Sequence, residues 1–187
     1  MVVGLLMAVS PAVVQLYFRS QQSRLVSEWS AAKKKVESVE TRTAPVEAPV
    51  LGSITTGPAI LDIEDIGLKV AVVSGTSQLD LAKGPGLINS TSRPGEEGNV
   101  AIAGHRTMYG APFRRLHELR AGDELVLKLP DADLLYVIRK TGRVKPSDSS
   151  VLDSFGDNRL TLISCDPPFS AKFRLVVVGR FKNILQR

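Results

Sequence analysis

Cysteine and histidine are scarce in this chain. Among 187 residues, Cys165 is the one cysteine, and His105 and His117 are the two histidines. A lone cysteine excludes an intramolecular disulfide, and one thiol with two separated imidazoles does not supply the three or four ligands of a zinc site. A Walker phosphate loop and a Rossmann glycine fingerprint are also missing. We therefore expect no metal and no cofactor.

Aromatic residues are few, at 5%, although the net charge is +5 and the pI is near 9.5. Nucleic-acid-binding domains usually group basic residues with aromatic ones on one face, so nucleic acid is a poor candidate partner. The densest basic run, Lys33-Lys34-Lys35, follows an apolar segment closely. It fits a negatively charged membrane or wall surface, and a solvated helix face is the alternative.

The apolar segment covers residues 2–18 and is almost free of charge. Its length is at the lower edge of a membrane-spanning helix, about 17–25 residues. We predict a signal anchor over 1–19; the alternative is a cleaved signal peptide, but a basic leading region and a nearby A-x-A site are lacking. The basic residues after the segment favour the opposite orientation by the positive-inside rule. Because long C-terminal domains can translocate despite such charges, we still expect a single-pass protein with its domain on the extracellular face.

Three further divisions follow along the chain. Residues 20–44 have helical composition without proline or glycine, which predicts a juxtamembrane helical stalk. Residues 45–58 hold several prolines and glycines and no amphipathic period, which is typical of a linker. We expect the folded domain over 59–187.

Short aliphatic runs separated by turn residues fill that domain. Strands are predicted at 68–73, 99–103, 124–129, 134–139, 160–164 and 173–178, with a helical turn or two at 76–83 and 111–120. This spacing favours an all-β barrel or sandwich over a parallel α/β sheet.

Cys165 ends the run LTLIS and precedes the turn-rich DPPFSAK. A thiol at the end of a rigid strand suits a nucleophile, and a buried structural cysteine is the alternative. His105 lies between two glycines just after a predicted strand, whereas His117 lies among charged residues of a predicted surface helix. We therefore favour His105 as the partner of Cys165.

Arg174 begins the strand after Cys165, and the short connection predicts an antiparallel hairpin that returns Arg174 to the cysteine. A nearby cation favours the thiolate and can hydrogen-bond the oxyanion of a tetrahedral intermediate. A solvated arginine on an edge strand is the alternative. Thiol, imidazole and guanidinium together form a set for acyl transfer.

The segments TLISC (161–165), FRLVVVGR (173–180) and NVAIAGHRT (99–107) resemble, in this order, the signature of sortases. The resemblance covers about residues 61–181. It implies a closed eight-stranded sortase-type β-barrel with short helices, preceded here by the predicted N-terminal membrane helix and stalk. It also implies that Cys165, His105 and Arg174 are the catalytic residues.

The resemblance further implies a cysteine transpeptidase. Such enzymes cleave a C-terminal sorting motif of secreted proteins, hold the acyl fragment as a thioester, and transfer it to an amine of a cell-wall precursor or a pilin. The form AGHRTMYGAPF (103–113) is most similar to class E sortases of actinobacteria, with class D as the neighbour. Class E implies an LAxTG-like signal, related to LPxTG.

Substrate contacts are expected from Tyr109, Thr107 and Ser164. Tyr109 follows the histidine loop, where packing against its own loop is the alternative role. Ser164 stands where the family usually has threonine and keeps the hydroxyl, which implies a contribution to the oxyanion pocket. Glu64 and the pair Leu87-Ile88 also depart from the family pattern, which bears on the class and the peptide preference.

Two other functions compete with transpeptidation. A thiol hydrolase or protease would use the same Cys–His pair with water as the acceptor. A non-catalytic surface-binding β-domain on a membrane stalk would leave the settings of Cys165, His105 and Arg174 as coincidences.

Overall fold

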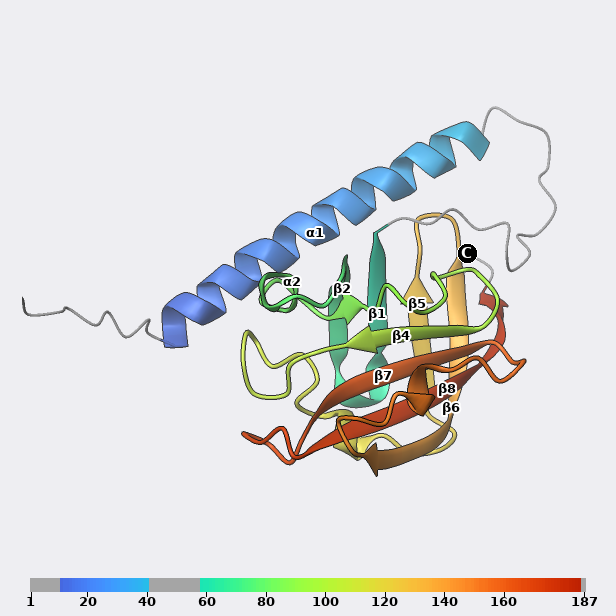
Figure 1. Cartoon of the computed structure of the whole chain (residues 1–187). Coiled ribbons are helices and arrows are strands. Elements are labelled where there is room, and N and C mark those ends of the chain that lie inside the picture. The colour runs from blue at the N-terminus through green and yellow to red at the C-terminus, as the bar shows by residue number, and fades with distance from the viewer. Residues whose placement is uncertain (1–10, 41–57, 186–187) are drawn as a thin grey trace, which may run out of the picture.

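The computed structural model describes residues 11–40 and 58–185. A long N-terminal helix lies along the outside of a closed β-barrel (Figure 1). The elements in chain order are α1 (Pro11–Glu40), β1 (Ala59–Ile63), η1 (Glu64–Ile66), β2 (Leu68–Ser74), α2 (Gln78–Leu81), β3 (Gly86–Leu87), β4 (Asn99–Ala103), η2 (Leu116–Glu118), β5 (Glu124–Lys128), β6 (Asp133–Val144), η3 (Ser150–Leu152), β7 (Arg159–Asp166) and β8 (Phe173–Leu185).

The eight strands close in the order β1-β2-β3-β4-β7-β8-β6-β5. Most neighbours are antiparallel, but β2 with β3 and β4 with β7 are parallel. Closure removes the exposed sheet edges that an open sheet of this size would leave. The prediction of a closed eight-stranded barrel is confirmed.

Alternate residues of the strands fill the barrel, as the period of two requires. Leu61, Leu127, Leu160 and Val177 are fully buried in one core cluster. Phe113 joins them from the loop after β4 and has no exposed surface. The core thus supports the loop that carries the candidate histidine.

Each predicted strand is present, and β6, β7 and β8 extend beyond the predicted limits. The predicted helical turns at 76–83 and 111–120 correspond to α2 and η2. No strand was predicted at β1 or at β3. Strand β3 has only two residues, too short for a period to be read.

The N-terminal helix differs from the expectation of an anchor followed by a separate stalk. Helix α1 runs without a break across the predicted boundary at residue 19, because residues 12–40 contain no proline or glycine. In the described part of the chain, no helix is long and apolar enough to cross a membrane. Residues 1–10 of the predicted anchor and nearly all of the linker at 45–58 lie outside the described residues.

Helix α1 also binds the barrel instead of standing clear of it. The side-chain amide of Gln22 accepts from Ala71 N at 2.7 Å and donates to Lys83 O at 2.8 Å. The indole of Trp29 donates to Lys128 O at 3.1 Å. Phe18 packs against the core cluster. These contacts hold α1 against β2, the loop before β3, β5 and the core.

Candidate active site

Cys165 lies on the outer face of β7, near the end of the strand. Leu160 and Leu162 of β7 point into the core, and Ser164 and Asp166 follow on the same inner face and are buried. The alternation therefore turns Cys165 outward, where its side chain is partly exposed. The alternative of a cysteine buried in the core does not fit this position.

His105 lies beside Cys165 because β4 and β7 run parallel. Their register pairs Ala103 with Ile163, and each candidate residue is two positions beyond its member of that pair. The alignment continues past the end of β4. Gly104 N donates to Ile163 O at 3.0 Å, and the Ser164 hydroxyl donates to Gly104 O at 2.8 Å.

Arg174 flanks Cys165 on the other side. The two residues are direct partners in the antiparallel β7–β8 pair, so their side chains share the outer face. The Arg174 guanidinium donates through Nη1 to Ala171 O at 3.1 Å and to Phe173 O at 3.2 Å. The structure thus brings Cys165 of β7 and Arg174 of β8 together with His105 of the loop after β4, although 60 positions separate the histidine from the cysteine.

His105 is half-buried, and this burial lowers the pKa of its imidazole from the ordinary value of 6.5. The neutral ring is therefore favoured near neutral pH, and a neutral imidazole can accept the proton of a thiol. The ring lies 5.2 Å from that of Tyr109, centroid to centroid, with 41° between the planes.

The other histidine has a different setting. His117 lies on exposed η2, with Nδ1 3.2 Å from Arg114 O. It has no register relation to β7, which agrees with the choice of His105 as the partner of the thiol.

The residues expected to contact substrate lie in two places. Ser164 is buried, and its hydroxyl proton is given to Gly104 O, so in this conformation it supports the histidine loop. Thr107 and Tyr109 line a cavity of about 860 Å³ between the histidine loop and α1. The substrate contacts of all three remain predictions.

A model of the sortase domain matches residues 61–182, a range that contains the three candidate residues. This chain belongs to the sortase family. Sortases are cysteine transpeptidases, and this sortase is therefore an enzyme of that kind.

Relatives of both the expected classes are similar to this sortase. Sortase D of Bacillus subtilis is 33% identical over 80% of this chain and 78% of its own length. Sortase SrtE1 of Streptomyces coelicolor is 28% identical over 84% of this chain, which spans only 46% of that protein.

Solved structures of class D and class E sortases are also similar to this chain. A sortase D5 transpeptidase of Clostridium perfringens superposes with a TM-score of 0.72 at 27% identity, covering 88% of this chain and 99% of that one. Sortase E of Streptomyces avermitilis superposes with a TM-score of 0.61 at 34% identity, covering 68% and 88%. Sortase family membership and its barrel fold are thus shown, with relatives in classes D and E.

A buried ion pair joins the histidine loop of the sortase to its cysteine strand. Arg106 follows His105, Asp166 follows Cys165, and the Arg106 guanidinium donates from Nη1 to Asp166 Oδ1. The two side chains are 5% and 2% exposed, and Arg143 Nε contacts the second carboxylate oxygen. The pair fixes the two chain segments that carry the thiol and the imidazole.

Sequence reasoning missed Arg106 and Asp166. Each is the neighbour of a residue singled out for chemistry, and each carries a charge opposite to the other. Because strand neighbours point to opposite faces, an outward thiol implies an inward Asp166, and a buried carboxylate requires a partner. That signal could have found the pair.

Strained backbone conformations occur in the histidine loop and in the β7–β8 connection, the two loops beside the site. Among the described residues, the non-glycine residues with positive φ are Tyr109 at 48°, Ala111 at 46° and Phe169 at 62°. The first two lie in the histidine loop and the third in the β7–β8 connection. A strained backbone conformation persists where the surrounding structure holds the residue in place, and such residues are often found at functional sites.

In the described part of the sortase, no group of three or more His, Cys, Asp or Glu residues could hold a metal ion.

Proposed function

We propose that Cys165 is the nucleophile of this sortase, His105 its proton partner and Arg174 the oxyanion donor. The observation that supports the proposal is the register of β4, β7 and β8: Arg174 pairs with Cys165, and His105 follows the β4 residue that pairs with Ile163 by two positions, as Cys165 follows Ile163.

In the first half of the reaction, the Cys165 thiol gives its proton to neutral His105. The sulfur attacks the scissile carbonyl carbon, and Arg174 stabilises the negative oxygen that forms. The carbon–nitrogen bond then breaks, the imidazolium protonates the departing amine, and a thioester remains on Cys165.

In the second half, an acceptor amine attacks the thioester carbon and gives its proton to His105. A new amide bond forms and the Cys165 sulfur leaves. The imidazole and thiol return to their starting states, so the exchange needs no other reactant.

We propose that the substrates are secreted proteins with a C-terminal LAxTG-like or LPxTG-like motif. The acceptor is an amine of a cell-wall precursor or a pilin. The similarity to class D and class E sortases supports this substrate class, and the apolar segment at 2–18 supports a single-pass membrane protein with an extracellular catalytic domain.

The test is mass spectrometry of products from LAxTG and LPxTG peptides, with and without an added amine. The proposal requires an amide of the added amine, formed by the wild-type chain and by His117→Ala, and absent with Cys165→Ala or His105→Ala. Cleavage that yields only the free acid, whatever amine is added, would instead identify a thiol hydrolase. Transfer by Cys165→Ala would remove Cys165 from the mechanism.

Selective alkylation of Cys165 by a thiol-reactive probe in the folded protein is also expected. Labelling as slow as that of a buried thiol would favour the non-catalytic binding domain.

A further inference from the structure

Three segments lie at the end of the barrel where Cys165 lies. They are the first turns of α1, the histidine loop at 104–115, and the β7–β8 connection at 167–172, and they form the left-hand edge of the molecule (Figure 1). We call this edge the thiol end. The opposite end holds the segments that precede β4 and β7, at 93–98 and 156–158.

Exposed apolar side chains are concentrated at the thiol end. Phe169 is 92% exposed and Met108 is 53% exposed. Val13, Leu16 and Tyr17 of α1 are also exposed. Of the eight large hydrophobic residues exposed in the described chain, these five belong to the three segments of the thiol end. Phe169 has a φ of 62°, so the chain holds a bulky ring in water at the cost of backbone strain.

The three segments of the thiol end are rich in basic residues. Residues 11–22, 104–115 and 166–174 contain six Lys and Arg residues and a single acid, Asp166, which is buried and paired. The acids next to these segments are Glu118, which pairs with Arg115, and Glu64 and Asp65 of η1, whose Ile66 carbonyl accepts from Arg115. Arg19, Arg114 and Lys172 are exposed. The opposite end carries Glu96, Glu97 and Asp157 together with Arg93, Arg159 and Arg180.

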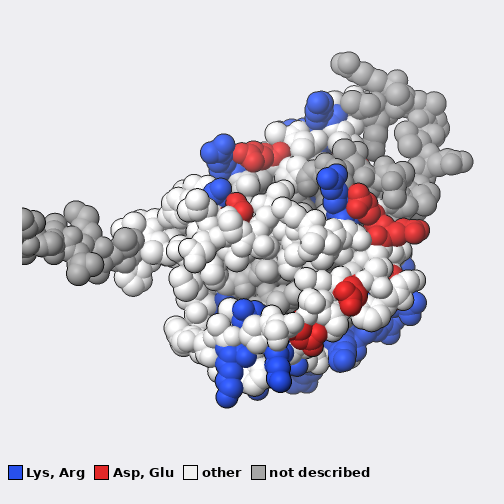
Figure 2. Space-filling model, in the orientation of Figure 1, with Lys and Arg blue, Asp and Glu red and all other residues white. Residues whose placement is uncertain are grey.

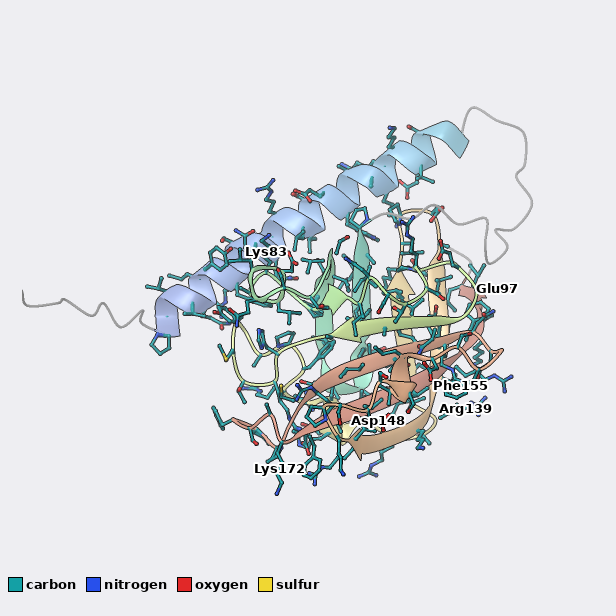
Figure 3. All side chains as sticks on the ribbon, in the orientation of Figure 1. Lys83, Glu97, Arg139, Asp148, Phe155 and Lys172 are labelled. Atoms are coloured by element: carbon teal, nitrogen blue, oxygen red, sulfur yellow. The ribbon has the colours of Figure 1, made fainter. Side chains whose placement is uncertain are left out.

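In Figure 2, lysine and arginine side chains lie along the lower left, and others lie at the lower right and the top; acidic side chains lie at the right and also at the upper left. In Figure 3, Lys172 lies at the lower left, near the β7–β8 connection, and Glu97 lies at the far right.

Exposed apolar side chains with cations around them are the features of a surface that lies in a membrane interface. The apolar groups enter the boundary between headgroups and acyl chains, and the cations bind anionic headgroups. Residues 1–10, MVVGLLMAVS, contain no charged side chain and directly precede α1 at this end. The aromatic content is low and the patch carries its own apolar groups, so a bilayer fits better than nucleic acid.

We propose that the thiol end docks on the surface of an anionic lipid bilayer, with Phe169 and Met108 inserted and with Arg19, Arg114 and Lys172 on the headgroups. The barrel then lies against the membrane, and the outer face that carries Cys165 is held within reach of substrates tethered there. This docking is independent of the acyl-transfer chemistry.

The test uses the full chain in vesicles of phosphatidylglycerol and phosphatidylcholine that contain a shallow nitroxide-labelled lipid. Each protein carries Cys165→Ala and one new cysteine labelled with a fluorophore. Phe169→Cys and Met108→Cys report on the thiol end, and Glu97→Cys is the matched control at the other end. All three positions are exposed, so the labels do not disturb the core.

We expect quenching at positions 169 and 108 to be at least about twofold stronger than at 97, because an interfacial surface enters the bilayer by about 5–10 Å. The double variant Arg114→Glu/Lys172→Glu is expected to reduce quenching at 169. Equal quenching at positions 169 and 97 would overturn the proposal. Quenching at position 169 that is as strong in the double variant as in the unsubstituted surface would overturn the role of the cations.

Cleavage of a soluble peptide by Arg114→Glu/Lys172→Glu, with Cys165 intact, separates this proposal from the proposed function. Neither residue is in the catalytic set, so cleavage is expected to remain. If positions 169 and 97 are quenched equally but the peptide is cleaved, the docking alone is rejected. If position 169 is quenched more than position 97 but the wild-type chain does not cleave the peptide, the acyl-transfer chemistry alone is rejected.

Discussion

At the scale of single residues, the site depends on what His105, from the loop after β4, and Arg174, from β8, supply to Cys165. His105 contributes a neutral ring because burial lowers the pKa of its imidazole. Arg174 contributes a cationic guanidinium with several N–H donors. Asp166 fixes the strand end from inside the barrel, through Arg106 and Arg143. Each role predicts a different outcome of substitution.

Arg174→Ala should slow transfer without unfolding the protein. Removing one oxyanion donor typically raises the barrier by about 2.7–4 kcal/mol, which appears in kcat. Arg174→Lys keeps the charge but loses the planar fork, so we expect partial recovery. Arg180→Ala is the control, since it lies on the same outer face of β8 but farther along the strand. A kcat for Arg174→Ala equal to that of the control would exclude the role.

His105 should make the protein less stable in mild acid. Its pKa is lower in the folded chain than the ordinary 6.5, so the unfolded chain binds more protons at intermediate pH. The free energy of unfolding is then highest above pH 6.5 and falls as the pH drops toward the folded pKa. Urea unfolding across this range is expected to show a weaker dependence in His105→Gln than in His117→Gln. Identical pH profiles for the two variants would contradict this origin.

Asp166→Asn should destabilise the fold strongly. The substitution leaves the buried Arg106 without its counter-charge, and breaking a buried pair on one side typically costs about 3–5 kcal/mol. Asp148→Asn is the comparison, because Asp148 is exposed and its carboxylate accepts from the nearby Ser150. Chemical denaturation of both variants measures the difference, and similar unfolding midpoints would show that the pair does not lock the two segments.

At the scale of elements, the histidine loop is held from two sides. From the core, the Phe113 ring lies so close to Gly104 that a Cβ there would be 2.6 Å from a ring carbon. From outside, the Phe18 ring of α1 would be 2.4 Å from a Cβ at Gly110, where φ is 74°. Helix α1 therefore positions the loop that carries His105.

This contact predicts coupling between Phe18 and Gly110. Gly110→Ala should lower both stability and kcat/KM, because the new methyl group meets the ring and the residue takes a strained φ. Adding Phe18→Ala removes the clash, so the double variant should be less impaired than the sum of the two single variants. Thermal unfolding and peptide transfer measure the cycle, and strict additivity would mean that the helix and the loop do not act together.

At the scale of the whole molecule, α1 and the barrel form one structural unit in the described residues. The Gln22 side chain hydrogen-bonds to backbone groups of β2, and the Trp29 indole hydrogen-bonds to a backbone carbonyl of β5. The first turns of α1 also form part of the thiol end. A helix docked in this way links the N-terminal segment to the site, which a freely standing stalk would not do.

The double variant Gln22→Ala/Trp29→Phe should therefore lower the stability of the full chain. Each lost hydrogen bond contributes about 0.5–1.5 kcal/mol net, and the exposed barrel groups regain only water. Circular dichroism during urea unfolding measures the loss. Ser27→Ala is the control, because its hydroxyl bonds only to Arg24 within the exposed face of the helix. A double variant as stable as the control would show that the docking is not specific.

The sequence alone determined six of the eight strands, because alternating burial imposes a period of two that short aliphatic runs display, whereas β1 and β3 were not predicted. It also determined the chemistry available to the chain, since one thiol and two imidazoles leave few combinations. The hairpin that sets Arg174 opposite Cys165 was predictable for a local reason, the short connection between β7 and β8.

Only the tertiary structure decided the rest. The parallel pairing of β4 with β7 joins segments 60 positions apart, and nothing local in either strand specifies that partner. The Arg106–Asp166 pair and the docking of α1 depend on the same long-range closure. Sequence periodicity shows which face of a strand is buried. Which strands become neighbours is decided only when the barrel closes.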